Sequence, residues 1–416
     1  TVAASVSIAA TLAENSIGGA TLATMDDSAV TAGGDVTITA LGANTIHAFA
    51  VAAAVSVSGS GTVAISGAGT GAAATNTTTN TVEASIVNGS DVDATGSVML
   101  LAEDTSAITA QLFSAAMSVA ASGAFAASVS IALTLAQNSI GGETLATIEG
   151  SSVDAGGVVS LTALADTTID ALGVAVAVTV AGSGGGAVGG AGTGVIVGTT
   201  TTNTVEASIT GGSIVTAVGE VTLGATDTSE IDSIVAAVSF AAAGSSAAAI
   251  SFAMAVSVAD NQFGSVVRSA IDASDVTSQT GDVTLDALSD GSVEATSVGV
   301  GIAVGGAGGF SLTFAGSGAI ATTTATNLTE AIIGGGSSVV ATSGMVTLTA
   351  TDDTEIDVEV LALSVSGGGA GGVSINVSLA AAVALTDVQS TMRSVIDDSS
   401  VTAGGAVALS ADATTD

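Results

Sequence analysis

The side chains best suited to chemistry in this sequence are aspartates that occur in pairs next to turn-forming residues. Carboxylate oxygens are the ligands that Ca²⁺ prefers, and pairs that recur along a regular repeat could hold structural Ca²⁺ between neighbouring turns of the chain. The glycine-rich nonapeptide of calcium-binding repeat proteins is missing, so we favour solvated surface acids as the interpretation. The candidate calcium ligands are Asp26, Asp27, Asp91, Asp93, Asp352, Asp353, Asp397 and Asp398.

Imidazole and basic side chains are almost absent. His47 is the single histidine, and the matching segment of a later repeat, residues 166–170, holds no second type of metal ligand, so we predict no metal site there. Arg268 and Arg393 are the only basic residues. We expect each to pair with an acid in its own segment or with an acid on a neighbouring coil, and the acids in those segments are Asp272 and Asp397.

The arrangement of these residues argues against an enzyme. An active site is singular, whereas the acidic features recur with every repeat and none pairs a carboxylate with a base in an arrangement that occurs once. Tryptophan and tyrosine are absent, which argues against an aromatic platform for sugars. We therefore predict no catalytic residue and no cofactor.

The charge balance limits the possible partners. The chain has 37 acidic residues against 2 basic ones, for a formal net charge of -35. Nucleic acids and anionic membrane surfaces both attract basic proteins, so neither is an expected partner. Acidity on this scale keeps a protein soluble and self-repelling, and salt or divalent cations relieve the repulsion.

These residues are positioned by a repeat that runs through the whole chain. The phrase SAVTAGGDVTITA at residues 28–40 returns in related form six more times, and its closing alanine falls at 40, 102, 163, 225, 287, 350 and 411. The period is therefore about 62 residues, which indicates a repeat architecture. We predict one continuous array over residues 1–416, with no cap or anchor domain, and interpret it as part of a longer polypeptide or as a subunit that stacks end to end. The repeat phrases occupy residues 28–40, 90–102, 152–163, 213–225, 274–287, 338–350 and 400–411.

Within each phrase, apolar and polar residues alternate after a glycine, which predicts a β-strand. Glycine pairs such as Gly33–Gly34 and Gly156–Gly157 precede these strands, and we expect them to supply the positive φ angles of tight turns. Between phrases, segments such as residues 48–74 place two runs of valine, alanine and serine around a glycine cluster. We expect two strands joined by a bend there.

Half of every repeat is free of acidic and basic residues, as between Asp35 and Glu83 or between Asp170 and Glu206, where His47 is the one titratable exception. Several neutral runs exceed the roughly 20 residues of a membrane-spanning helix, but small and hydroxyl residues fill them, so we predict no membrane span. We expect sheet that is buried on both faces, inside a coil or against another chain.

Successive repeats also alternate. Odd-numbered repeats begin with blocks such as residues 12–28, whereas even-numbered ones begin with threonine-rich blocks, as at residues 75–86, 199–209 and 322–333. The true unit is therefore a pair. Arrays of threonine at rung spacing bind ice in some solenoids, but these blocks occur in alternate repeats only and lack a long alternating threonine series, so we favour plain threonine ladders.

The recurring pattern T-x-A-x-I, then S-x-V-x-A-x-G-x-V-x-L-x-A, then a glycine-rich neutral run, resembles the repeat regions of filamentous-haemagglutinin-like bacterial adhesins, particularly leukotoxin-type filamentous adhesins and giant surface proteins. The resemblance covers essentially the whole chain. It implies a secreted, cell-surface β-solenoid stalk. The chain departs from the family in lacking lysine, tyrosine and tryptophan.

Together these observations predict an all-β parallel β-solenoid of about seven 62-residue repeats arranged as alternating pairs. Three short coils of roughly 20 residues per repeat would give a rod of roughly 100 Å, whereas one wide coil per repeat would give about 35 Å. We favour the short coils. The expected function is the structural shaft of an extracellular bacterial filament or giant adhesin whose copies associate with one another, and the alternative is a directly adhesive module for cells, matrix or ice.

Overall fold

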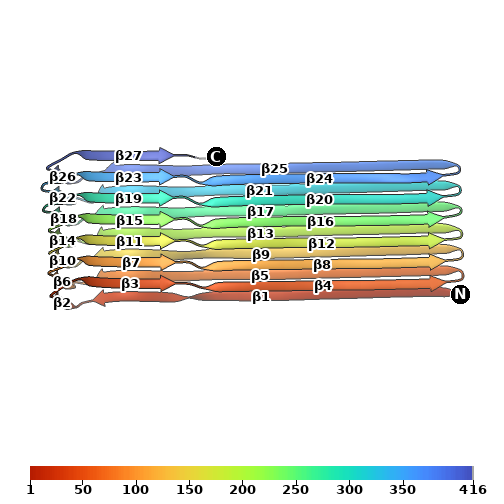
Figure 1. Ribbon diagram of the computed structural model, residues 1–416, viewed down its shortest axis with the longest axis horizontal. Coiled ribbons are helices and arrows are strands. Elements are labelled where there is room, and N and C mark those ends of the chain that lie inside the picture. Colours follow the sequence, from red (N-terminus) through yellow and green to blue (C-terminus); the bar gives the residue numbers. More distant parts are fainter. Residues whose placement is uncertain (415–416) are drawn as a thin grey trace.

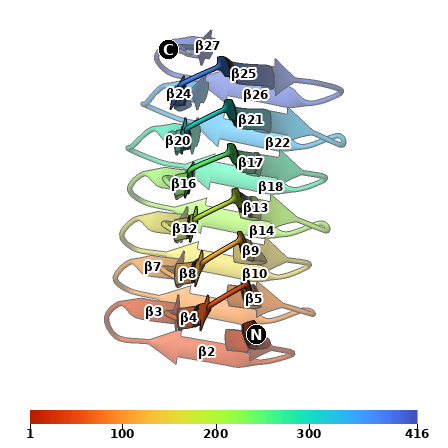
Figure 2. The same ribbon diagram turned by 90° about the vertical axis from the view of Figure 1, so that its right-hand side faces the viewer.

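The computed structural model describes residues 1–414 and shows seven parallel coils stacked in chain order (Figure 1). Each repeat forms one coil, and a complete coil contains four β-strands that belong to four separate parallel sheets. The prediction of an all-β parallel solenoid is confirmed. Residues 415–416 of the predicted array lie outside the described residues. Figure 2 looks along the strands and shows each coil as a flattened loop with the next coil above it.

The first two strands of each coil differ greatly in length. The long strands hold 24 or 25 residues and are β1 (Val2–Asp26), β5 (Val63–Val87), β9 (Phe125–Glu149), β13 (Gly186–Thr210), β17 (Ala248–Asp272), β21 (Phe310–Gly334) and β25 (Val373–Ile396). Each is followed by a strand of 4 residues, namely β2 (Ala29–Ala32), β6 (Asp91–Ala94), β10 (Ser152–Ala155), β14 (Ile214–Ala217), β18 (Asp275–Ser278), β22 (Ser338–Ala341) and β26 (Ser400–Ala403).

The chain then returns along the long strand in two steps. The first step has 7 residues, in β3 (Val36–Gly42), β7 (Val98–Asp104), β11 (Val159–Ala165), β15 (Val221–Asp227), β19 (Val283–Ser289), β23 (Val346–Asp352) and β27 (Val407–Ala413). The second has 16 residues, in β4 (Thr45–Ser60), β8 (Ala107–Ser122), β12 (Thr168–Ser183), β16 (Glu230–Ser245), β20 (Ser292–Ala307) and β24 (Glu355–Ala370).

The preference for short coils was wrong. Register partners lie one full repeat apart, as in the pairing of Val36 with Val98, so one repeat makes one wide coil. At about 3.3 Å per residue a 25-residue strand spans about 80 Å, whereas seven coils at about 4.8 Å each rise only about 34 Å. The stack is therefore wider than it is tall. The strands of a coil have unequal lengths, which is why the sequence shows no shorter period.

The turns confirm the predicted strand boundaries but not the reason given for the glycines. Positive φ angles occur one turn earlier, after the long strand, at Asp27, Asn88 and Gly89 among others. Gly156 and Gly157 have no such angle. A Cβ on Gly156 would lie 2.4 Å from the carbonyl oxygen of Thr95 on the coil below. These glycines are therefore required by close stacking between coils.

The two ends of the flattened coil have different interiors. Around the repeat phrases, columns of valine, isoleucine and leucine fill the core, as in Ile38, Leu100, Leu161 and Leu223, which stack in register. At the far end the interior is lined with alanine, serine and threonine, and hydroxyls bridge the two layers, as between Ser118 Oγ and Ser128 Oγ at 2.7 Å. Small side chains let the two layers approach closely there.

The expectation that the neutral runs are buried on both faces was also wrong for the single chain. Each neutral run forms two strands joined by a bend, as predicted, and every second side chain points inward. Most of the inward residues are small, and Leu112, Val195 and Val235 are among the larger exceptions. Leu133 on β9 is 55% exposed, whereas Ala132 beside it is fully buried. Because the two layers are close, small residues fill most of the space between them, and most of the large apolar side chains point outward.

Candidate interaction surfaces of the neutral half

We call the uncharged end of the coils the neutral half. It consists of the strand segments in which no Asp, Glu or Arg occurs: residues 1–13, 48–74, 110–136, 171–197, 233–259, 295–321 and 360–384. Because the coils stack in register, these segments superimpose and their outward side chains form two continuous faces. One face belongs to the long strands and the other to the 16-residue strands.

The face of the long strands is ridged. One register column reads Ile8, Gly69, Ile131, Gly192, Met254, Gly316 and Leu379, so a large apolar residue on every odd coil alternates with glycine on every even coil. The next column, two residues further along, again has glycine on the even coils, at Gly71, Gly194 and Gly318, and its odd coils carry Leu133 and Val256 in the middle of the stack and alanine at the two ends. We call this the ridged face. In these columns the alternating pairs of the sequence become ridges and grooves, whereas other columns of the face carry large residues on even coils as well, such as Ile65, Ile196 and Phe314.

Two of the grooves appear as cavities. Above Gly71, between the ridge residues Leu12 and Leu133, lies an apolar hollow of ≈ 540 Å³. Above Gly316 and Gly318 lies a second apolar hollow of ≈ 230 Å³. Neither is lined by a charged residue. They are therefore suited to apolar side chains and lack the convergent polar groups of a catalytic pocket.

The face of the 16-residue strands has no glycine grooves over most of its extent. Its register columns carry valine, phenylalanine, methionine and isoleucine on consecutive coils, as in Val55, Met117, Val178, Phe240 and Ile302. We call it the smooth face. Val55 is 56% exposed and Met117 is 41% exposed. Both faces of the neutral half are thus apolar, and between them lies an interior of small residues.

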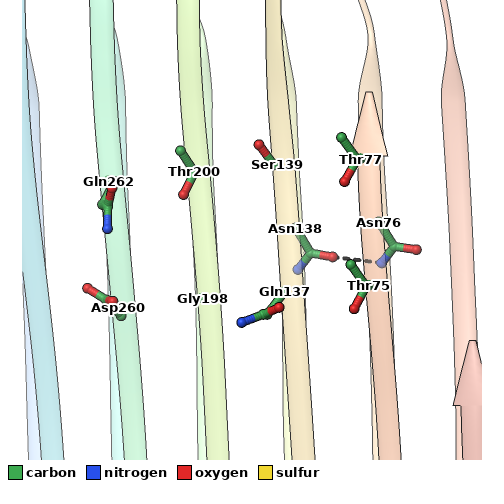
Figure 3. A pocket seen from close by; sticks show the side chains of 10 residues that line it. All are labelled: Thr75, Asn76, Thr77, Gln137, Asn138, Ser139, Gly198, Thr200, Asp260 and Gln262. Carbon is green, nitrogen blue, oxygen red and sulfur yellow. Dashed lines mark hydrogen bonds between the residues drawn. The ribbon is translucent and has the colours of Figure 1, made fainter. Parts of the chain in front are cut away.

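A polar hollow of ≈ 280 Å³ marks the boundary between the ridged face and the charged part of the coils (Figure 3). Its floor is at Gly198, and Gln137 and Asp260 from the flanking coils border it. Beneath it runs a ladder of buried amides, in which Asn76 Nδ2 donates to Asn138 Oδ1 at 2.7 Å. The hollow contains a single acidic side chain, so nothing in it pairs an acid with a base.

The sequence did not point to the buried carboxylates of the even coils. Asp227 is fully buried, and it accepts hydrogen bonds from Ser229 Oγ at 2.5 Å and from Ser265 Oγ at 2.5 Å. Burial raises the pKa of Asp227, and hydrogen bonds from Ser229, Ser265 and Asn203 oppose that rise. Asn203 Nδ2 also donates to Ser229 Oγ at 2.9 Å. The cluster joins the two layers inside one coil to the coil above.

The same cluster occurs on two other even coils. Asp104 with Ser106, and Asp352 with Thr354, repeat the short bond from hydroxyl to carboxylate, at 2.6 and 2.5 Å. The available signal was an Asp-x-Ser/Thr triplet in each even repeat, together with the asparagine of its threonine-rich block. That asparagine is Asn80, Asn203 or Asn327. These side chains satisfy one another within a closed core, so we assign them a structural role.

Acids also stack on the outer surface. Asp170, Asp232, Glu294 and Asp357 occupy one outward register column on consecutive coils. The pKa of Asp232 is raised, first by partial burial and then by the charges of Glu294, Asp170 and Glu230. Like charges at coil spacing repel one another, so this column costs stability that salt can restore.

The candidate calcium ligands are not brought together as compact sites. Asp352 points into the core and Asp353 points to solvent, because neighbours in a strand face opposite sides. Asp91 and Asp93 are both exposed. Asp26 accepts a 2.7 Å hydrogen bond from Asn88, and Asp27, Asp397 and Asp398 are exposed at their turns. No group of three or more Asp, Glu or His side chains placed to hold a metal ion occurs within residues 1–414. The interpretation of these residues as solvated surface acids, with calcium binding as the alternative, stays a prediction.

The two arginines pair with acids on the preceding coil. Of the two expected alternatives, pairing with a neighbouring coil is therefore confirmed, and pairing with Asp272 or Asp397 is not. Arg268 lies 3.8 Å from Glu206, and Arg393 lies 2.9 Å from Glu330. In register the column runs Glu206, Arg268, Glu330, Arg393, so opposite charges alternate. His47 is exposed on β4, and Thr109 is its partner on the next coil.

Across residues 1–414 no helix has the length and apolarity that crossing a bilayer requires. Comparisons with known proteins add no relative: no family model, no curated protein and no solved structure matches this chain.

Proposed function

We propose that the chain is a structural protein, the repetitive shaft of an extracellular bacterial filament or giant adhesin, whose copies associate through the neutral half. The observation that carries the proposal is that large apolar side chains stack in register on the outside of an otherwise acidic protein, on the odd coils of the ridged face and on consecutive coils of the smooth face. Soluble monomers rarely expose continuous apolar patches above a few hundred Å². The ridged face, about 12 residues by seven coils, covers about 1,300 Å², and the smooth face, which has six strands, covers about 1,100 Å².

The distribution of charge supports the same proposal. The repulsion due to a net charge of -35 is concentrated at one end of the coils, and the other end is uncharged. Copies that meet through their neutral halves keep their acidic ends apart and in solvent. The resemblance to filamentous-haemagglutinin-like adhesins supports a location at the bacterial surface. No described feature combines acid, base and cavity in one place, and we propose no catalytic activity.

The wide coil changes what such a shaft provides. A coil of about 62 residues adds only about 4.8 Å of length, so the chain forms a broad ribbon with two large faces. Each residue of the proposed shaft therefore adds little to its length, and the coils instead provide a large surface for lateral assembly.

Electron microscopy of the purified chain tests the proposal. Filaments, sheets or bundles are the expected result, and dispersed compact particles would contradict it. The adhesive alternative has a separate readout, because the fragment would then bind cells, matrix or ice while its copies stay dispersed. Threonines on the even coils favour this alternative only weakly, since the odd coils place Ser139, Gln262 and other residues in the same column as Thr200.

A further inference from the structure

We propose that the ridged face is the docking surface for the ridged face of a second copy, with the odd-coil ridges of each copy seated in the even-coil grooves of the other. This inference rests on the proposed self-association and specifies its geometry. The occupant is a second copy of this chain, because the face is complementary to itself.

Self-complementarity follows from the alternation of side chains. Ridges such as Ile131 and Met254 are two coils apart, which is about 9.6 Å, and glycine such as Gly192 forms the floor between them. Two packed sheets lie about 10 Å apart with interdigitating side chains. One row of apolar side chains therefore fits the width of each groove.

A simple symmetry produces this match. A two-fold axis parallel to the strands reverses the order of the coils and keeps each residue at its position along the strand. When coil three faces coil four of the partner, coils one to six face coils six to one. Each odd coil among these six faces an even coil, Ile131 stands over the partner's Gly192, and coil seven lies outside the contact. The interface is then isologous, and the smooth face of each copy stays outside it, where further copies can join.

The cavities and the area support a stable contact. The hollow of ≈ 540 Å³ lies above Gly71 between the ridges of coils one and three, where the ridge of a partner would enter. The hollow above Gly316 occupies the equivalent place between coils five and seven. The six coils in contact cover about 1,100 Å² of this face, which exceeds the roughly 800 Å² per partner of a standard stable interface. No charged side chain lies within it, so no charge is buried by docking.

Filling the grooves tests this geometry against general apolar attraction. A Cβ at Gly71, Gly192 or Gly318 would meet no atom within 4 Å, and none of the three has a positive φ. The triple variant Gly71→Val, Gly192→Val, Gly318→Val therefore leaves the fold intact while it increases the apolar area. General apolar attraction would strengthen the association, whereas ridge-in-groove docking must weaken it.

Sedimentation velocity over a range of concentrations provides the measurement. We expect the wild-type chain to associate and the triple valine variant to show an apparent Kd raised about tenfold or more, the cost of overpacking a closely fitted interface. The matched control carries Ala53→Val, Ala115→Val and Ala236→Val, which add methyl groups to the smooth face, and it should associate at least as tightly as wild type. The single variant Gly192→Ala should show a smaller loss in the same direction.

Each remaining outcome separates the two proposals. If the wild-type chain associates and the triple valine variant associates equally or more tightly, the ridge-in-groove geometry is wrong while lateral assembly stands. If the wild-type chain stays monomeric, the proposed self-association and this inference fail together. If uncharged phosphatidylcholine vesicles bind the wild-type chain and dissolve its assemblies, the ridged face is a lipid-binding surface and the inference is overturned.

Discussion

Gly71 and Leu133 are register partners on adjacent coils, and the glycine leaves an open space beside a leucine that is 55% exposed. The same relationship recurs along the stack, where glycine on an even coil lies next to a larger apolar residue on an odd coil. The alternation of the sequence repeats therefore appears on the surface as grooves and ridges. Other glycines of the same coils, such as Gly156, instead allow the backbones of neighbouring coils to lie in close contact.

The two kinds of glycine should respond oppositely to alanine. At Gly71 a Cβ enters open space, so Gly71→Ala should stabilise the fold by about 0.4–1 kcal/mol through reduced entropy of the unfolded chain. At Gly156 a Cβ would lie 2.4 Å from the carbonyl oxygen of Thr95, so Gly156→Ala should destabilise the fold by about 1–3 kcal/mol. Chemical denaturation of the two variants measures both effects. If both variants changed the unfolding free energy by the same amount and in the same direction, the two kinds of glycine would not differ as proposed.

Substituting an inward-facing leucine should reduce the stability of the fold, whereas substituting an outward-facing leucine should reduce self-association. Leu161 is fully buried in the core of the charged end, so Leu161→Ala should cost about 2–5 kcal/mol of unfolding free energy. Leu133→Ala removes the same atoms from an exposed ridge, so it should change the unfolding free energy by about 0.5 kcal/mol or less and weaken self-association. Denaturation and sedimentation of both variants are required. A large loss of stability for Leu133→Ala in the monomer would contradict the outward assignment.

The buried carboxylate of Asp227 predicts a pH dependence of stability. Its folded-state pKa lies above the ordinary value of 3.8, because burial disfavours the charged form. The folded state therefore holds the proton more tightly. The resulting stabilisation is complete below pH 3.8 and is lost as the pH rises through the folded-state pKa.

Asp227→Asn removes this titration while it keeps an acceptor for the hydrogen bonds from Ser229. We expect a higher Tm than wild type at pH 7 and a flatter dependence of Tm on pH. Asp227→Leu instead leaves those donors unpaired, at about 1–3 kcal/mol for each buried group. The exposed Asp353→Asn is the control for loss of one negative charge. The prediction fails if Asp227→Asn has a lower Tm at pH 7 and an unchanged slope.

The outward acidic column predicts a dependence on salt. Asp232 lies in register between Asp170 and Glu294, so raising NaCl from low to moderate concentration should raise the Tm of the wild-type chain. Asp232→Asn should reduce that gain. CaCl₂ and MgCl₂ at matched ionic strength should have equal effects if the candidate calcium ligands are solvated acids. A saturable increase in Tm with Ca²⁺ alone would instead indicate a specific calcium site.

The strand that follows the glycine of each repeat phrase could be predicted from sequence because its inward positions, such as Val36 and Ile38, are large and apolar and alternate with threonine. The width of the coil could not be predicted from the sequence. Four strands of unequal length leave no shorter period, and only the register of whole repeats, such as Val98 against Val159, determines which residues stack.

The sequence also did not allow us to predict that the large residues of the neutral half point outward. Both faces of those strands carry apolar residues, so alternation alone does not say which set lies inside. The spacing between layers decides it, since Ser118 and Ser128 meet across the interior. The cluster at Asp227 was missed for a related reason, because Asn203 and Ser229 are distant in sequence and meet only when the coil closes.

Sedimentation equilibrium of the 416-residue chain, from nanomolar to micromolar concentration, most directly tests the claim that the neutral half assembles copies of this protein. The mass of one chain is 38.6 kDa. Masses that rise with concentration to at least twice this value are the predicted result. A single species of 38.6 kDa at every concentration would contradict it.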